Sequence, residues 1–314
     1  MRPPCVASRR RSWRAALAAL LAPALAAACA PADAVVGAAL PADAGTLLFS
    51  SELATKGAAW DDFLPLPDER VTYGVANAAA RDGFVAELRF PGDPTRAPTD
   101  DAGPSLNAGI ETRQYFLYGT FRARVRFATC APTEEIASAV FMYFSDGRDE
   151  DGNGIVDNPE LDFHVLCGTP SFIVLTAWSD DQVVAGVETF RKRSHAVDMT
   201  TGDLYDTAAT DDPTYTKNGR DPSLARPDFP APGAFYEVGI ERAAAGVRFF
   251  IVLDGAELTL WTLADPTFVP RTPMPLMFNL WHPATHWLPA RTAADYPAHD
   301  GVMLVDWAEW TAAP

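Results

Sequence analysis

The segment from Tyr118 to Phe127 constrains the fold most, because two sets of side chains alternate along it. One set is Gly119, Phe121, Ala123, Val125 and Phe127, and the other is Tyr118, Thr120, Arg122, Arg124 and Arg126. Successive side chains of a β-strand point to opposite faces, so one face of this strand belongs to a core and the other faces water. Similar short runs, separated by Pro and Gly, recur along the chain. They predict an all-β sandwich with few, short helices.

A second strand pair is expected from Val247 to Trp261. The run Val247 to Leu253 is apolar at almost every position, and Asp254-Gly255 then predicts a hairpin turn into Glu257 to Trp261. The continuous apolar pattern suggests a central hairpin. The polar region from about Thr200 to Pro232 is instead expected to be a long, solvated surface loop or insertion.

The first 28 residues predict a signal peptide. Arginines at 9, 10, 11 and 14 precede fourteen apolar residues, 15–28, which end at Cys29. This run is shorter than the roughly 20 residues of a membrane-spanning helix. The sequence before Cys29 resembles a bacterial lipobox, although its leucine stands four places before the cysteine and not three, so lipidation of Cys29 and simple cleavage both stay open.

We therefore expect an exported bacterial protein, either a cell-envelope lipoprotein or a secreted protein, that meets a membrane only through a lipid anchor. Residues 29–44 would form a flexible tether, and residues 45–314 a single domain, which we expect to be monomeric. Cys130 and Cys167 are the pair of cysteines that remain besides Cys29. In an oxidising compartment they predict a disulfide, with two buried thiols as the alternative.

The six residues Glu160 to Val165 carry the strongest chemical signal. Leu161, Phe163 and Val165 would form one face of a strand, and Glu160, Asp162 and His164 the other. Alternating acids do not favour a strand, and neighbouring carboxylates raise one another's pKa. The row therefore suits proton transfer or cation binding, with an ordinary solvent-facing polar strand as the alternative.

Several segments, in this order along the chain, resemble glycoside hydrolase family 16, which includes laminarinases and lichenases. They are 108–113 with 118–125, 160–162, 235–241 with 253–255, 273–281 with Trp287, and 303–307. The resemblance implies a concanavalin A-like β-jelly roll of two antiparallel sheets. It also implies a sugar site on one sheet, where endo-acting, retaining cleavage of β-glucans takes place without a required cofactor.

On this resemblance Glu160 is the nucleophile and Asp162 the group that orients it. The family's last glutamate would fall at 164 or 165, where this chain has His164 and Val165. His164 could act as the acid, since its unperturbed pKa of about 6.5 would be raised by the two nearby acids. The alternative is a catalytically silent, lectin-like protein in which His164 pairs with Asp162.

Candidate sugar-binding residues are Trp281, Asn279 and Trp287, of which Trp287 is the preferred stacking platform; for Trp281 a place in the core is the alternative. The family's tryptophan-rich strand appears here as Ala137 to Met142, without Trp-Pro. Loss of the five signal-peptide arginines leaves 20 basic side chains against 41 acidic ones, a formal net charge of −21. This charge excludes nucleic acid as a partner and favours a neutral, β-glucan-like polysaccharide.

The segment Asp149 to Glu160 fits the calcium-loop pattern D-x-D-x-N-G-x-x-D-x-x-E. Its candidate ligands are Asp149, Asp151, Asn153 and Asp157. Because a carboxylate bound to Ca²⁺ is a poor nucleophile, either the loop binds its ion without Glu160, or Glu160 is a ligand and the enzyme hypothesis fails. A plain acidic turn is the third alternative.

Overall fold

The structure is a computed structural model of the 314-residue chain, and it describes residues 46–62, 70–96, 107–168, 171–207, 214–283 and 295–313. The predicted signal peptide, tether and lipidation site at Cys29 lie outside these residues, and so does Trp287. Within the described ranges, no helix is long and apolar enough to cross a membrane.

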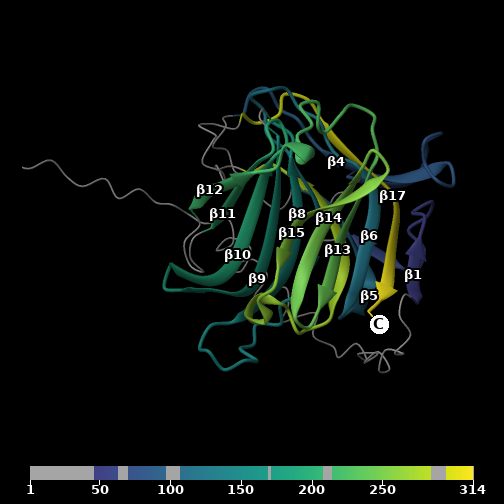
Figure 1. Cartoon of the computed structure of the whole chain (residues 1–314). Helices are drawn as coiled ribbons and strands as arrows, with labels where there is room; N and C mark the ends of the chain where they lie inside the picture. The colour runs from purple at the N-terminus through teal and green to yellow at the C-terminus, as the bar shows by residue number, and fades with distance from the viewer. Residues whose placement is uncertain are drawn as a thin grey trace, which may run out of the picture.

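Two antiparallel sheets pack against each other (Figure 1), which confirms the predicted all-β sandwich. The first has the order β15 (Ala256–Leu263), β14 (Gly246–Leu253), β13 (Tyr236–Ala243), β6 (Gly119–Arg126), β17 (Gly301–Ala312), β4 (Phe84–Phe90) and β3 (Val71–Ala76), and β1 (Leu47–Ser51) also pairs with β17. The second has the order β12 (Tyr215–Arg220), β11 (Asp203–Thr207), β10 (Val187–Asp198), β9 (Phe172–Val184), β8 (Asp157–Leu166), β7 (Ala137–Tyr143), β16 (Met274–Trp281), β5 (Ala108–Phe116) and β2 (Trp60–Asp62). In the described part of the chain, the helices are two short 3-10 turns, η2 (Pro222–Leu224) and η3 (Pro266–Phe268).

The core lies between the two sheets and is rich in aromatic side chains. The alternation predicted for β6 is present, since Phe121 and Val125 are fully buried while the arginines between them are partly covered. Phe121 approaches Phe278 of β16, with ring centroids 5.7 Å apart, and Phe127 stacks on Phe163 of β8 at 6.4 Å. Each such side chain stabilises the sandwich by about 1.5–3 kcal/mol relative to an exposed one.

The hairpin of β14 and β15 is present, but it lies at the edge of its sheet. Its turn residues Asp254 and Gly255 have φ values of 53° and 77°, as a type I′ turn requires. The expectation of a central hairpin is wrong because β15 ends the sheet. The apolar pattern is continuous because Phe250 points away from the core, where the guanidinium groups of Arg122 and Arg248 cover its ring at 4.6 and 4.7 Å.

The polar region from residue 200 to 232 corrects another expectation, since it contains β11, β12 and η2 and is not a loop throughout. β11 pairs with the end of β10, and β12 pairs with β11, so the region extends the nine-stranded sheet. Its polar side chains partly pair with one another, as Lys217 and Arg220 do with Asp203. Edge strands carry such pairs on the face that is not buried, which is why the sequence resembled a loop.

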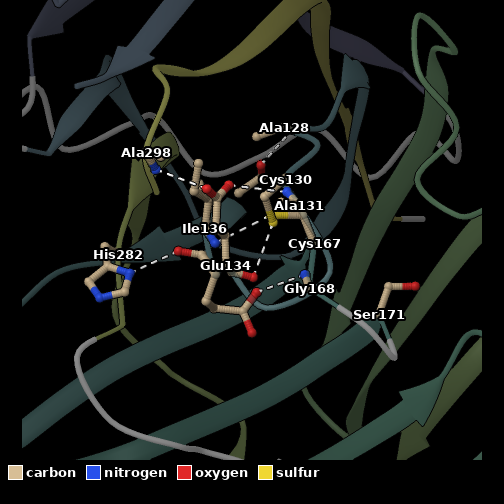
Figure 2. The surroundings of a disulfide bond; sticks show 12 residues. Ala128, Cys130, Ala131, Glu134, Ile136, Cys167, Gly168, Ser171, His282 and Ala298 are labelled. Atoms are coloured by element: carbon tan, nitrogen blue, oxygen red, sulfur yellow. Dashed lines mark hydrogen bonds between the residues drawn. A yellow bond between two sulfur atoms is a disulfide. The ribbon is translucent and has the colours of Figure 1, made fainter. Parts of the chain in front are cut away.

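Cys130 and Cys167 form a disulfide, with an S–S distance of 2.04 Å and Cα atoms 5.7 Å apart (Figure 2). Cys130 precedes β7, and Cys167 follows β8 directly. The Ile136 amide donates to Cys167 Sγ at 3.3 Å, and His282 Nδ1 lies 2.8 Å from the carbonyl oxygen of Glu135. The disulfide therefore anchors the end of β8 to the chain that leads into β7.

The disulfide closes a loop of 37 residues, so its removal is expected to lower the free energy of unfolding by about 2–4 kcal/mol. The double variant Cys130→Ser/Cys167→Ser, measured by urea denaturation, should show this loss. The wild-type protein in reducing agent serves as the control and should fall to the same level. Equal stability of oxidised and reduced wild type would contradict the prediction.

Candidate functional site

Strand β8 places the three predicted site residues on one face of the nine-stranded sheet. Leu161, Phe163 and Val165 point into the core between the sheets. Glu160, Asp162 and His164 alternate with them and therefore lie on the outer face. Four strands lie on each side of β8, which is therefore the middle strand of its sheet.

The three groups differ in how far they are exposed. Asp162 is only 2% exposed and His164 only 8%, whereas Glu160 is half-buried. Across the neighbouring strands, Tyr143 and Trp178 lie directly opposite Glu160. Glu160 is thus the accessible end of the row, and two aromatic residues flank it.

His164 lies at the apolar end of the row. A second, small hydrophobic cluster on the outer face consists of Ala137, Leu166, Phe172, Val174, Ala196 and Tyr215, with Trp281 packed against it. The Trp281 ring stands edge to face with His164 at 5.9 Å. Trp281 is therefore half-buried on the outer face and does not belong to the core between the sheets.

Asn279 joins the same area of the sheet. Ala139 of β7 pairs with His164 on one side and with Asn279 of β16 on the other, so only a methyl group separates the two side chains. The Asn279 side-chain oxygen is buried and accepts no hydrogen bond from the described residues. The structure thus brings Asn279, Trp281 and His164 together, while Trp287 cannot be placed because it lies outside the described residues.

A row of hydroxyl groups continues from Asp162 towards β12. Strand pairing places Thr176 opposite Asp162, Ser194 opposite Thr176, and Tyr215 opposite Thr207. Ser194 Oγ donates to Thr176 Oγ1 at 3.2 Å, and the Ser194 amide donates to Thr207 Oγ1 at 3.2 Å. None of the four hydroxyl residues is predicted from the sequence, because their alignment depends on the register of five strands.

Across the strands on the other side of Asp162, the cross-strand partners are first apolar and then acidic. Phe141 and Met277 come first, and Glu111 of β5 and Asp61 of β2 follow. Burial raises the pKa of the Glu111 carboxyl to about 7, and the nearby Asp61 carboxylate contributes to the rise. Glu111 lies within the family-like segment 108–113, but no local sequence pattern shows that Asp61 pairs with it.

The predicted calcium loop gathers three carboxylates. Oxygen atoms of Asp149, Asp151 and Asp157 all lie within 4.8 Å of one another, and Glu160 is not in this group. The amides of Asn153 and Gly154 donate to Asp149 at 3.1 and 2.8 Å, which wraps the backbone around that carboxylate. Clustered carboxylates on a tightly turned backbone suit a hard cation such as Ca²⁺.

A fourth carboxylate, which the loop pattern in the sequence does not include, lies beside this loop. Asp180 of β9 is fully buried and is the cross-strand partner of Asp157. Asn153 Nδ2 donates to both Asp151 and Asp180, at 2.9 Å each. Burial raises the pKa of Asp157, and the charges of Asp151 and Asp180 add to the rise, against a hydrogen bond from the Glu150 amide. A cation would relieve this repulsion between carboxylates, so the residues of this loop fit a bound Ca²⁺ ion.

Known structures share the fold of this chain. The laminarinase catalytic domain from Thermotoga maritima superposes with a TM-score of 0.52 and 14% identity, covering 87% of this chain and 100% of that chain. The Bacillus licheniformis β-glucanase gives 0.49 and 14%, covering 86% and 99%. The Crh5 transglycosylase in complex with NAG gives 0.48 and 18%, covering 88% of each chain. The sequence matches no family model and no curated protein. At these identities the likeness shows the jelly-roll fold alone.

The raised pKa of Glu111 predicts that this residue makes the free energy of unfolding depend on pH. Between pH 4.5 and 7 the unfolded chain releases this proton while the folded protein keeps it, so stability falls as the pH rises through this window. We expect Glu111→Gln to match wild type at pH 4 and to be more stable at pH 8, by on the order of 1 kcal/mol after allowance for partial exposure.

Urea denaturation at both pH values measures the difference. Glu241→Gln is the matched control, because Glu241 pairs with half-buried Arg248 on the opposite sheet. This variant should show no gain in stability relative to wild type between pH 4 and pH 8. A stability difference for Glu111→Gln that is independent of pH would overturn the assignment.

Proposed function

We propose that this protein is an exported carbohydrate-active protein that cleaves internal linkages of a neutral β-glucan by a retaining mechanism centred on Glu160. The observation that carries the proposal is the placement of Glu160, Asp162 and His164 on the outer face of the middle strand, with Glu160 as the accessible member. The fold shared with a laminarinase catalytic domain supports the choice of β-glucan. The net negative charge supports a neutral substrate.

In this proposal each group has a separate task. The Glu160 carboxylate attacks the anomeric carbon while the bond to the leaving oxygen breaks, and the His164 imidazolium transfers its proton to that oxygen. The neutral imidazole then takes a proton from water, the water oxygen attacks the anomeric carbon, and the bond to Glu160 breaks. Asp162 lies between the two residues and keeps the Glu160 side chain oriented.

Sugar binding would use the side chains around this row. Tyr143 and Trp178 flank Glu160 and offer aromatic faces or edges to a pyranose ring. Asn279 offers a side-chain oxygen that accepts no hydrogen bond from the described residues, which a sugar hydroxyl would satisfy. Trp281 and Trp287 remain part of the proposed sugar site, Trp281 because it contacts His164.

A second candidate is binding of the same glycans without cleavage. It is favoured by the surroundings of His164, which is 8% exposed beside an apolar cluster. Residues four apart on a strand have Cα atoms about 13 Å apart, whereas a retaining pair acts across about 5–5.5 Å. Cleavage therefore requires Glu160 and His164 to lean towards each other over Asp162, and binding does not.

We also propose that the loop of Asp149, Asp151, Asn153 and Asp157 binds Ca²⁺ as a structural ion. In this arrangement Glu160 does not ligate the ion and can act in the reaction, because it is not part of the group of Asp149, Asp151 and Asp157. The ion would supply charge neutralisation for the buried Asp180 and its partner Asp157. No step of the reaction depends on it.

The central prediction is that Glu160→Gln lowers reducing-sugar release from laminarin by at least ~1000-fold, because it removes the nucleophile. Binding in a polysaccharide pull-down should be kept, since the substitution preserves shape. Glu241→Gln, a matched change on the opposite sheet, should release sugar at the wild-type rate. Unchanged sugar release by Glu160→Gln would contradict the assignment of Glu160 as the nucleophile.

His164→Glu, measured beside wild type, distinguishes cleavage with His164 as the acid from glycan binding without cleavage. If His164 is the acid, this variant should still release sugar, with its pH optimum moved down towards the glutamate range. If wild type binds laminarin and mixed-linkage glucan without releasing sugar, the binding function is correct and the reaction is not.

Calcium is expected to raise the melting temperature of the wild-type protein, because an ion that binds only the folded state at 100 times its Kd adds about 2.7 kcal/mol. Asp151→Asn should lose most of this shift. Asp146→Asn is the control, because Asp146 pairs with exposed Arg148 and is not one of the clustered carboxylates. Thermal unfolding with CaCl₂ and with EDTA measures the effect, and an equal calcium shift in Asp151→Asn would rule this loop out.

A further inference from the structure

Tyr215 is unusual for a residue of an edge strand, because it is almost fully buried. It is only 8% exposed, and its ring packs into the outer-face cluster beside Leu166, Val174 and Ala196. The strand that carries it, β12, is the last of the nine-stranded sheet. The ring therefore lies over the outer face of the sheet, towards the strands that carry the candidate site.

The hydroxyl of Tyr215 does not end in this apolar cluster. It hydrogen-bonds with the hydroxyls of Ser194 and Thr176. Ser194 in turn donates to Thr176 Oγ1 at 3.2 Å, and Thr176 is the cross-strand partner of Asp162. Because the Thr176 hydroxyl accepts from Ser194, it keeps its own proton to donate. Strand pairing places Thr176 opposite Asp162 on the same face, so the Asp162 carboxylate is the acceptor we infer for that proton.

The energetics of burial indicate a role beyond packing. Ser194, Thr176 and Asp162 are 2%, 6% and 2% exposed, and buried polar groups cost free energy unless they bond with one another. A phenylalanine would fill the same volume at position 215 without a hydroxyl to satisfy. Burial raises the pKa of Tyr215, and the charges of Asp162 and Asp206 add to the rise, so its hydroxyl keeps its proton and stays a donor.

We propose that Tyr215 is a positioning residue which, through the hydroxyls of Ser194 and Thr176, holds the Asp162 carboxylate in its ionised form and fixes its direction. This inference rests on the proposed function in so far as Asp162 orients Glu160. Hydrogen-bond chains of this kind strengthen when each hydroxyl both accepts and donates. The strand pair β11–β12 is then a functional part of the site, because it delivers Tyr215.

Within the part of the chain that the structure describes, few charged or titratable groups surround Asp162. On its own strand they are Glu160 and His164. On β10, Lys192 is the cross-strand partner of Trp178. On β11, the charge of Asp206 raises the pKa of Tyr215, at the other end of the row of hydroxyls. Phe141, its partner on β7, carries no charge. The hydroxyl chain is therefore the neutral donor system that faces Asp162 from the β9 side.

The test measures the pKa of the Asp162 carboxyl by carbon-13 NMR of aspartate-labelled protein, with Asp162→Asn assigning the signal. Tyr215→Phe removes the hydroxyl and keeps the ring, so we expect this pKa to rise by about 0.5–1 unit. Ser194→Ala breaks the next link and should move it in the same direction, and it serves as the second variant if Tyr215→Phe folds poorly. Tyr205→Phe is the control, because Tyr205 packs against the same cluster and its hydroxyl responds to Asp203 and Asp198 instead.

An unchanged Asp162 pKa in Tyr215→Phe and in Ser194→Ala would overturn the inference. Activity is a separate readout: in Tyr215→Phe the acidic limb of the kcat profile should move up with the Asp162 pKa, while KM stays within about twofold. If wild type releases no sugar, the proposed reaction fails, and the NMR result still decides the role of Tyr215. If wild type is active and the Asp162 pKa does not change in the variants, the positioning role of Tyr215 is contradicted while the proposed hydrolysis is retained.

Discussion

The structure depends on the burial of one face of each sheet against the other. Once Phe121 of β6 and Phe163 of β8 are committed to the shared core, strand geometry sends the residues beside them to the outer faces. A shift of one residue in β8 would place Glu160, Asp162 and His164 in the core, where unpaired charges cost several kcal/mol each. The hydrophobic core thus fixes the direction of the candidate site, and the disulfide after Leu166 fixes the end of its strand.

The two outer faces treat charge differently. On the eight-stranded sheet, acids and arginines pair in a ladder: Arg122 contacts both Glu237 and Glu257, and Arg248 contacts Glu241 and Glu257. The same arginines cover Phe250, so this face leaves little apolar surface open around it. The nine-stranded sheet also has acid-base pairs, such as Arg113 with Asp61, and Arg191 lies 3.9 Å from Asp180. It differs in having two cross-strand pairs of acids, Glu111 with Asp61 and Asp157 with Asp180. Carboxylates that lie opposite each other raise one another's pKa, so such pairs are suited to holding a proton, a cation or a ligand.

The sequence was informative where the signal is local. Alternation predicted β6 and β8, a two-residue turn predicted the β14–β15 hairpin, and one twelve-residue pattern predicted the carboxylate cluster of the acidic loop. The sequence was uninformative about features that depend on which strands are neighbours in a sheet. The edge position of β15, the strands within residues 200–232, and the neighbours Tyr215, Glu111 and Asp180 follow from pairings between distant segments. A buried row that crosses five strands has no period along the chain, so no window of sequence can contain it.

A bulge in β8 accounts for the separation of the acidic loop from the row of ionisable groups. Between Asp157 and Glu160 the chain advances three residues, while β9 advances only two, from Asp180 to Trp178. Residues three apart on a regular strand face opposite sides, but the extra residue returns both carboxylates to the outer face. Asp157 then turns to the loop and Glu160 to Tyr143 and Trp178. In a calcium loop of this pattern the twelfth residue is usually a ligand. Here the bulge separates that residue, Glu160, from the group of Asp149, Asp151 and Asp157, so a structural cation in the loop and a non-ligating Glu160 are compatible on one strand.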